Sequence, residues 1–238
     1  MATGGQPSGQ VPPTFPSHPP SLVQEIVGAS HGNVARVKEL LADRPALARA
    51  AWDWGYGDWE TALGAASHVG NREIAELLLV NGAQPTIFSA AMLGQLEVVK
   101  AFVLVRPGVQ KTRGAHGISL LNHAKAGAPG SAAVVSYLES LGDADPAYPN
   151  EPIDPAEIIG TYVFGDGPND RLLVTTPARG GLMMKREGMF DRGLRHHGNR
   201  VFNPVGAEAV RIRFEPPTGR ATSVTVEDGS LRLTARRT

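Results

Sequence analysis

A two-helix phrase that occurs twice between Trp59 and Leu104 constrains the fold more than any other feature of this 238-residue chain. Each copy begins near a hydroxyl residue, continues through an Ala-Ala pair to a glycine, and ends in an apolar run, Leu77–Leu79 in the first copy and Phe102–Leu104 in the second. One helix pair cannot cover apolar faces of this width, so neighbouring pairs must stack to bury them. The phrase therefore predicts an array of stacked helix pairs.

Individual residues of the phrase support this prediction. Thr61 can accept a hydrogen bond from a free N–H group of the helix that follows it, which favours a helix start there. Gly70 and Gly94 can adopt the positive φ angle of a tight turn between antiparallel helices. The phrase resembles the ankyrin repeat. This resemblance implies an α solenoid whose concave groove and hairpin fingers bind a protein or peptide partner.

Two weaker copies flank the repeated phrase. A degenerate copy covers Leu22–Leu41 and another covers Gly117–Gly142, so the resemblance predicts about four ankyrin repeats in residues 21–146. The turn glycines of the first three copies are 38 and 24 residues apart, against about 33 in regular arrays. The long first interval predicts an extended finger that includes Ala46–Asp58.

The period of the apolar pattern changes from 3.6 to 2 in residues 158–238. Val210, Ile212 and Phe214 alternate with polar residues, which is typical of a strand with one dry face. About eight such runs predict a small antiparallel up-and-down β-barrel. We favour an interior filled by side chains over a cavity for one small ligand, because the strands are short. The barrel resembles the lipocalin-like C-terminal domains of some bacterial serine hydrolases in the segments Gly160–Tyr162, Val210–Phe214 and Val224–Gly229.

The expected fold class is therefore α+β multidomain, with an N-terminal α solenoid followed by an antiparallel barrel. Residues 1–20 are rich in Gly, Ser and Pro, and we expect them to form a disordered tail. Four prolines between residues 146 and 155 mark a linker, placed at 147–157.

Charge is balanced overall but divided unevenly along the chain. From Arg171 onward there are 13 Lys and Arg against 6 Asp and Glu, and the preceding residues carry 10 against 17. We interpret the halves as two solvated surfaces of opposite bias; the alternatives are that the halves dock on each other or that each attracts a different partner. No basic stripe is interleaved with aromatic residues, so no nucleic-acid partner is predicted. The absence of cysteine excludes disulfides and thiolate metal sites.

The sequence shows few features that target a protein to a membrane or to export. No apolar run approaches the about 18–20 residues of a membrane span, so no membrane span is predicted. The N-terminus lacks the basic start and apolar stretch of an export signal. We expect a cytoplasmic protein from the sequence as it stands, and a periplasmic one if an export signal was removed ahead of Met1.

The finger contains the most unusual composition in the chain. Its aromatic and acidic side chains are Trp52, Asp53, Trp54, Tyr56, Asp58, Trp59 and Glu60. Aromatic residues give rigid contact area and are favoured at binding hot spots, and tryptophan beside carboxylates also suits a cationic ligand. The candidate partner-binding residues of the finger are Trp52, Trp54, Tyr56, Asp58 and Trp59. The alternative is that the tryptophans fold back against the side of the array.

Further candidates come from the helices. His68 and Met92 occupy matching places near the ends of inner helices, and His31 lies one place further along in the first repeat. In the ankyrin family these places face the groove, which implies a binding role for Met92. The fourth repeat adds three candidate binding residues, His116, Asn122 and His123.

Histidine titrates near neutral pH and can transfer protons when a carboxylate orients it. The catalytic candidates are therefore His68 as general base, with Asp53 or Glu60 beside it. A metal site needs converging ligands, and no two of these histidines have helical i, i+4 spacing. The sequence thus predicts neither a metal nor another cofactor.

Two functional hypotheses follow. The leading one is a non-catalytic protein that binds a protein or peptide through the concave ankyrin groove and the finger. The competing one is an enzyme or small-molecule binder, with a His, carboxylate and aromatic site between the array and the barrel.

Overall fold

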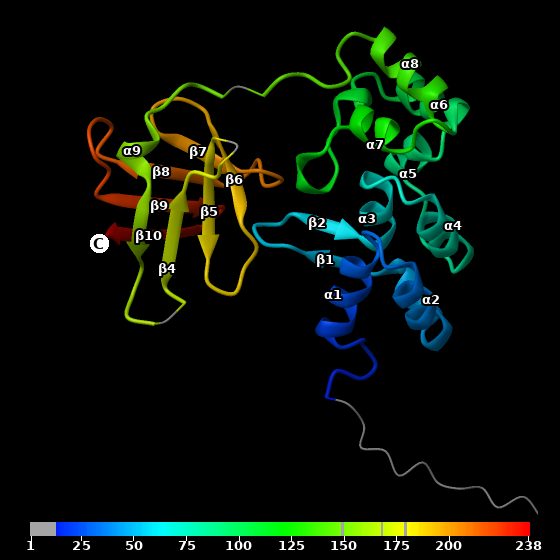
Figure 1. The fold of residues 1–238 in the computed structure, drawn as a ribbon, viewed down its shortest axis with the longest axis horizontal. Coiled ribbons are helices and arrows are strands. Elements are labelled where there is room, and N and C mark those ends of the chain that lie inside the picture. The colour runs from blue at the N-terminus through cyan, green and yellow to red at the C-terminus, as the bar shows by residue number, and fades with distance from the viewer. Residues whose placement is uncertain (1–12, 149, 168, 179) are drawn as a thin grey trace, which may run out of the picture.

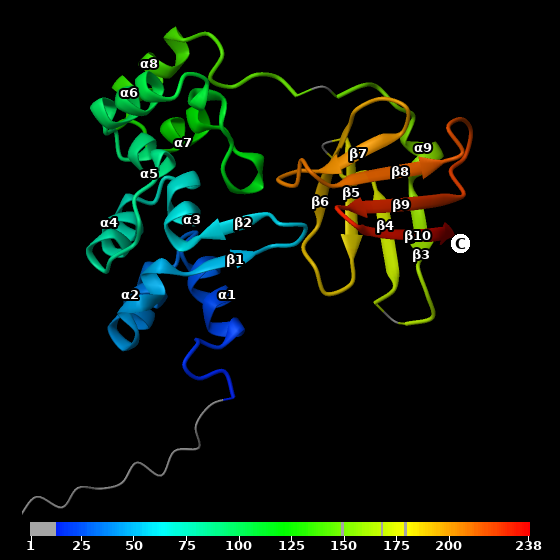
Figure 2. The same ribbon diagram turned by 180° about the vertical axis from the view of Figure 1, so that it is seen from behind.

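The computed structural model describes residues 13–148, 150–167, 169–178 and 180–238. A helical part and a β-barrel lie side by side, and the chain passes from one to the other along one edge of both (Figures 1 and 2). The predicted tail falls largely on residues 1–12, outside the described residues. No helix within the described ranges is long and apolar enough to cross a membrane.

Short helices and one hairpin build the helical part. Its elements are α1 (Pro20–Ala29), α2 (Val34–Asp43), η1 (Pro45–Arg49), β1 (Ala51–Asp53), β2 (Trp59–Thr61), α3 (Ala62–His68), α4 (Arg72–Val80), α5 (Ile87–Met92), α6 (Leu96–Val105), η2 (Val109–Lys111), η3 (Ala115–Gly117), α7 (Leu120–Ala126) and α8 (Ala132–Ser140). The three central helices pack in series, α3 against α5 and α5 against α7.

The predicted start and turn of the repeated phrase are both present. The Thr61 hydroxyl accepts a hydrogen bond from the Gly64 amide at 2.9 Å and caps α3. Gly70 and Gly94 have φ angles of +75° and +78°. A Cβ atom at Gly70 would collide with the carbonyl of Ala126, the last residue of α7, so the turn after α3 packs directly on the end of α7.

The barrel follows the predicted alternation of apolar residues. Its strands are β3 (Gly160–Val163), β4 (Arg171–Thr175), β5 (Leu182–Arg186), β6 (Arg192–His196), β7 (Val201–Pro204), β8 (Arg211–Glu215), β9 (Ser223–Asp228) and β10 (Leu231–Arg237). They close in the order β10-β3-β4-β5-β6-β7-β8-β9, and every neighbouring pair is antiparallel. The α+β class with an eight-stranded closed antiparallel barrel is therefore confirmed.

Aromatic side chains occupy much of the barrel interior. Tyr162, Phe202 and Phe214 are fully buried, and the Phe214 ring lies 5.4 Å from Tyr162 and 5.5 Å from Phe202 between centroids. The interior is not filled throughout, because a pocket of about 330 Å³ remains beside Leu172 and Met184. The short helix α9 (Pro155–Ile158) ends the predicted linker, and its last side chain is part of the barrel core.

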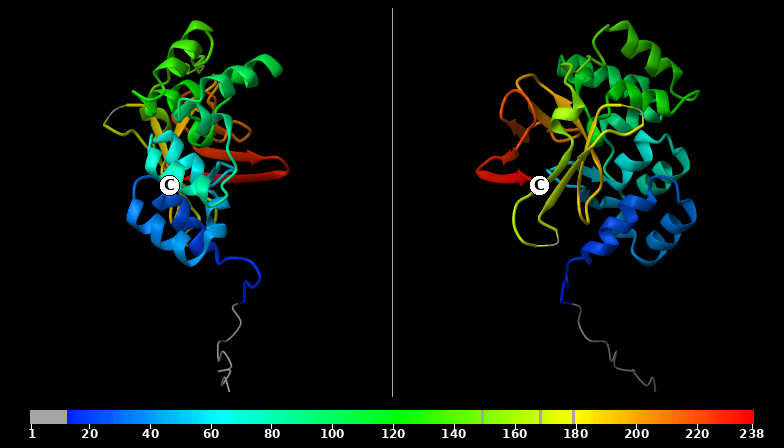
Figure 3. Two further views of the ribbon diagram at one scale, coloured as in Figure 1. Left: turned by 90° about the vertical axis from the view of Figure 1, so that its right-hand side faces the viewer. Right: turned by 60° about the vertical axis from the view of Figure 1, so that its left-hand side comes forward.

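The predicted finger forms the β1–β2 hairpin, which reaches from the helical part to the barrel (Figures 1 and 3). Tyr56, in the hairpin loop, packs against the core of the barrel. The Asp58 carboxylate forms an ion pair with Arg192 at the start of β6. The acidic half and the basic half thus dock on each other, which is one of the alternatives that the charge distribution left open.

Candidate functional site

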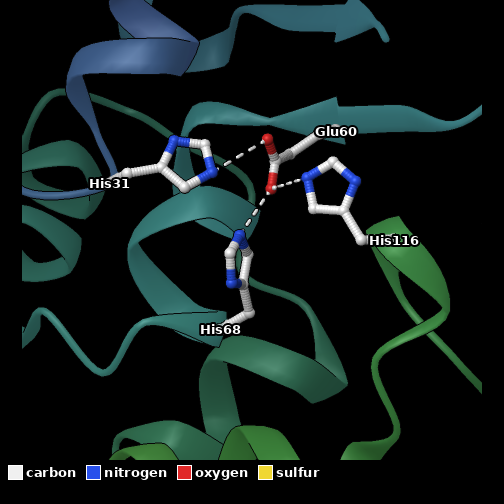
Figure 4. Close-up of side chains that lie close together, drawn as sticks. All are labelled: His31, Glu60, His68 and His116. Carbon is white, nitrogen blue, oxygen red and sulfur yellow. Dashed lines mark ion pairs between the residues drawn. The ribbon is translucent and has the colours of Figure 1, made fainter. Parts of the chain in front are cut away.

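Three imidazoles surround one carboxylate beside the contact between the two parts. We call this group the His/Glu cluster; its members are His31, Glu60, His68 and His116 (Figure 4). The Glu60 side chain, in β2, is fully buried. Its Oε1 lies 2.9 Å from His68 Nε2 and 3.4 Å from His116 Nε2, while its Oε2 lies 3.4 Å from His31 Nε2.

Each histidine comes from a different segment of the helical part. His31 follows α1, His68 is the last residue of α3, and His116 lies in η3. His116 has φ +57° and ψ +19°, a left-handed conformation that is uncommon for residues other than glycine. Its backbone amide donates to Asp58 Oδ1 at 2.8 Å, which stabilises this conformation and turns the ring toward Glu60.

The barrel reaches the cluster through Asp58. The Asp58 carboxylate contacts His116 Nδ1 at 2.7 Å and also pairs with the guanidinium of Arg192. The side chains of Asp58 and Arg192 are 1% and 9% exposed. A chain of contacts therefore runs from β6 through Asp58 and His116 to Glu60, and joins the barrel to the cluster.

The pKa values of the cluster follow from these contacts. Burial alone would raise the pKa of Glu60, but His116 and His68 outweigh it and lower the pKa to about 2. Burial alone would lower the pKa of His116, but Asp58 and Glu60 raise it to about 9. Burial lowers the pKa of His123, behind the cluster, to about 4. At neutral pH the cluster contains an ionised Glu60 and a protonated His116.

A pocket of about 490 Å³ opens onto the cluster between the helical part and the barrel. His31, Trp54 and His116 line it from the helical part. Phe190 and Arg192 line it from the barrel side, and the Trp54 and Phe190 rings meet edge to face at 4.8 Å between centroids. We call this pocket the cleft. Its walls are largely apolar, and the cluster supplies polar atoms at one side.

The finger side chains do not form the exposed binding surface that the sequence predicted. Trp54 is only 9% exposed and its Nε1 donates to Glu60 Oε2 at 2.7 Å. Trp52 packs on the helical core, and Tyr56 packs on the barrel. The helical core and the chain's own barrel therefore cover most of the aromatic faces of the hairpin. Trp59 is the exception, with 64% of its surface exposed.

The remaining candidates divide between core, site and surface. Met92 is fully buried, so the groove-facing prediction was wrong; the turn at Gly127 packs directly on its backbone. His123 is also buried, and its Nδ1 lies 2.8 Å from the Ser119 carbonyl oxygen. Asn122 is exposed and donates to Asp145 at 3.4 Å.

The predicted pair of His68 and Glu60 is brought together, but Asp53 does not orient His68. Asp53 Oδ1 accepts hydrogen bonds from the amides of Gly55 and Gly57 and so shapes the hairpin loop. The orienting role beside a histidine falls instead to Asp58. It lies five residues further along, on the opposite side of the loop from Asp53.

Sequence reasoning missed two features of the site. It did not place Arg192, whose position depends on the docking of two separate folds. It also took the lack of i, i+4 spacing as an argument against converging ligands, and that premise was wrong. The ligand atoms of the His/Glu cluster all lie within 4.8 Å of one another. The available signal was that His31 and His68 lie near the ends of helices in successive repeats, one position apart relative to their turn glycines.

Comparison with protein-family models and with curated proteins finds no match. Among solved structures, the chain is similar to two described as "Crystal structure of SurE" and "Crystal structure of SurE with D-Leu". In both cases the identity is 26%, the TM-score is 0.29, and the match covers 49% of this chain and 28% of the other. The matched region is thus little more than a quarter of those proteins, and a superposition this weak supports no functional argument.

Proposed function

We propose that the protein binds a small molecule in the cleft between the helical part and the barrel, with the His/Glu cluster as the polar end of the site. The observation that carries this proposal is the convergence of three imidazoles on a buried carboxylate at the edge of a pocket lined by both parts. Pockets that combine apolar walls with a few convergent polar groups are typical ligand sites.

The chemistry of the walls supports a class of ligand. Trp54, Phe190 and Val205 offer apolar surface for the body of a molecule. His31 and His116 present imidazoles to a head group that can accept or donate hydrogen bonds. Imidazoles beside carboxylates also suit proton transfer, so acid–base chemistry on the bound molecule is the catalytic form of this proposal.

The proposal also includes a fold type for the helical part and one for the barrel. We infer that the helical part is an ankyrin-type solenoid of about four repeats. The capped start at Thr61 and the close packing at Gly70 and Gly94 support this. We also infer a lipocalin-like barrel, supported by the sequential order of its strands. In such an arrangement the finger of the array joins it to the barrel.

A blocking substitution tests the cleft. Val205→Trp adds an indole to the lining of the cleft, whereas Val80→Trp places the same group at a site where valine is 86% exposed. Each protein is purified from the lysate of its own host and examined by native mass spectrometry. We expect a small-molecule adduct on the parent and on Val80→Trp, and its loss from Val205→Trp. An adduct retained by Val205→Trp, or absent from the parent, contradicts the proposal.

A second candidate function is the binding of a protein or peptide by the array. The exposed ring of Trp59 favours it, because this finger aromatic is covered neither by the helical core nor by the barrel. Trp59→Ala should then abolish co-purification of a polypeptide, while Trp52→Ala, whose side chain packs on the helical core, should not. Equal capture of the polypeptide by both variants would show that the finger does not bind it.

A further inference from the structure

We propose that the His/Glu cluster binds one divalent transition-metal ion of the zinc or cobalt class. The inference deepens the proposed function, because it rests on the cluster being the polar end of the cleft and names what the cluster holds there. Four observations carry it: the spacing of the ligand atoms, the partners of their outer atoms, two buried atoms without hydrogen bonds, and the donor set.

The spacing of the ligand atoms fits a tetrahedral ion. Metal–ligand bonds of about 2.0–2.1 Å place neighbouring tetrahedral ligands about 3.3 Å apart. Glu60 Oε1 lies 2.9 Å from His68 Nε2 and 3.4 Å from His116 Nε2. His31 Nε2 lies 3.4 Å from the other oxygen of Glu60, and one donor atom from each of the four residues lies within 4.8 Å of the others. Small side-chain shifts therefore suffice to enclose an ion.

The outer atoms of the ligands have the partners that metal-binding residues usually have. A metal-bound histidine generally donates its other ring N–H to a carboxylate or a backbone carbonyl, which fixes the ring. His116 Nδ1 lies 2.7 Å from the Asp58 carboxylate, and His31 Nδ1 lies 3.1 Å from the Gly28 carbonyl oxygen. The outer oxygen of Glu60 accepts a hydrogen bond from Trp54 Nε1. These contacts direct the Nε2 atoms of both rings toward Glu60.

Two atoms at the centre of the cluster have no hydrogen bond within the described part of the chain. They are Glu60 Oε1 and His68 Nε2, and both are buried. The atoms lie close together, but their orientation does not form a hydrogen bond between them. Buried polar groups without partners are costly and rare in folded proteins. An ion between the two atoms would satisfy both.

The donor set selects the class of ion. Three imidazole nitrogens and one carboxylate oxygen suit zinc and its first-row neighbours, whereas magnesium and calcium prefer sites made of oxygen atoms. His31 and His116 also line the cleft, so an ion in the cluster would face the bound small molecule. There it would attract an anionic or carbonyl oxygen of that molecule.

Cobalt provides the direct test, because a tetrahedral cobalt ion absorbs visible light. The full chain is stripped with a chelator and titrated with Co²⁺ while its visible spectrum is followed. We expect saturation at one equivalent and displacement of the signal by Zn²⁺. His31→Gln and His68→Gln should each weaken Co²⁺ binding by at least about 10–100-fold, the loss that changes to outer partners alone produce.

The matched control is His197→Gln, because His197 is an exposed histidine in the barrel, outside the cluster. It should bind Co²⁺ as the parent does. Far-UV circular dichroism establishes that each variant is folded. If His68→Gln unfolds, the test depends on His31→Gln, whose parent side chain is 32% exposed. A titration without a one-equivalent end point, or equal affinities in His31→Gln and His197→Gln, overturns the inference.

The same variants separate this inference from the proposed function. Val205→Trp should lose the small molecule and still bind one equivalent of Co²⁺, because Val205 lines the cleft but is not in the cluster. Retention of a small molecule by a parent protein that binds no Co²⁺ would leave the cleft proposal standing and remove the metal. A parent protein that binds one equivalent of Co²⁺ but no small molecule would leave the metal inference standing and remove the cleft proposal.

Discussion

The ion pair between Asp58 and Arg192 is the buried electrostatic contact that joins the hairpin to the barrel, and its loss should be costly. Arg192→Met keeps most of the aliphatic stem of the side chain and removes the charge. Asp58 then stays in place with its carboxylate buried, and His116 is its remaining charged neighbour.

The expected loss of stability follows from the burial of the ion pair. Removing one partner of a buried pair costs about 3–5 kcal/mol, because the other charge stays desolvated without compensation. The contact with His116 offsets part of this loss, so we expect about 3 kcal/mol for Arg192→Met. Arg232 and Glu227 form a matched surface pair at 3.0 Å, with side chains 69% and 32% exposed. Arg232→Met should cost about 0–1 kcal/mol.

Urea unfolding followed by tryptophan fluorescence measures this difference. All three tryptophans of the chain lie in the hairpin, so the signal reports directly on docking of the hairpin to the barrel. Asp58→Asn in the Arg192→Met background removes the buried charge that Arg192 no longer compensates and should recover part of the lost stability. Equal losses in Arg192→Met and Arg232→Met would refute the reasoning that the pair is buried and couples the two parts.

Other predictions concern pH, a turn and two tryptophans. With a chelator present, the free energy of unfolding should be greatest near pH 6.5. The raised pKa of His116 adds stability that is complete below pH 6.5 and is lost as the pH rises through about 9. The lowered pKa of His123 removes stability as the pH falls from 6.5 toward 4. The midpoint of urea unfolding, measured as a function of pH, tests this profile. His116→Asn should reduce the loss of stability above pH 6.5, and an unchanged loss in this variant would contradict the role given to His116. Gly94→Ala should lower the free energy of unfolding by more than 1 kcal/mol, since φ is +78° and a Cβ would meet the Gly130 carbonyl; thermal unfolding checks it. Trp54→Phe should lower the free energy of unfolding by about 1–3 kcal/mol, because it leaves Glu60 Oε2 without its indole donor. Trp59→Phe should change it by less than about 0.5 kcal/mol, because Trp59 is exposed. Similar losses in the two variants would contradict the burial of Trp54.

Local patterns predicted the elements of the fold because their causes are local. The alternation through Val210, Ile212 and Phe214 appears as β8 and its lead-in residue, with all three side chains in the barrel core. The capping hydroxyl of Thr61 and the turn glycines act within a few residues of themselves. Such effects can be recognised in sequence without knowledge of what the chain packs against.

The site was predictable only in part because its contacts are not local. Glu60 and His68 lie eight residues apart and were paired in advance, but Arg192 is 134 residues from Asp58. Exposure was also misjudged for Trp54, since a finger rich in aromatic residues binds equally well to a partner or to the chain's own barrel. Sequence spacing does not distinguish these two outcomes.

A crystal structure of the full chain, purified from its own host without chelator and with anomalous data collected at the zinc edge, would test the small-molecule site and the metal site together. We predict an ordered small molecule in the cleft against Trp54 and Phe190, and a single anomalous peak within the His/Glu cluster. A cleft that contains only water, with the small molecule in the barrel pocket and no anomalous signal at the cluster, would contradict the account.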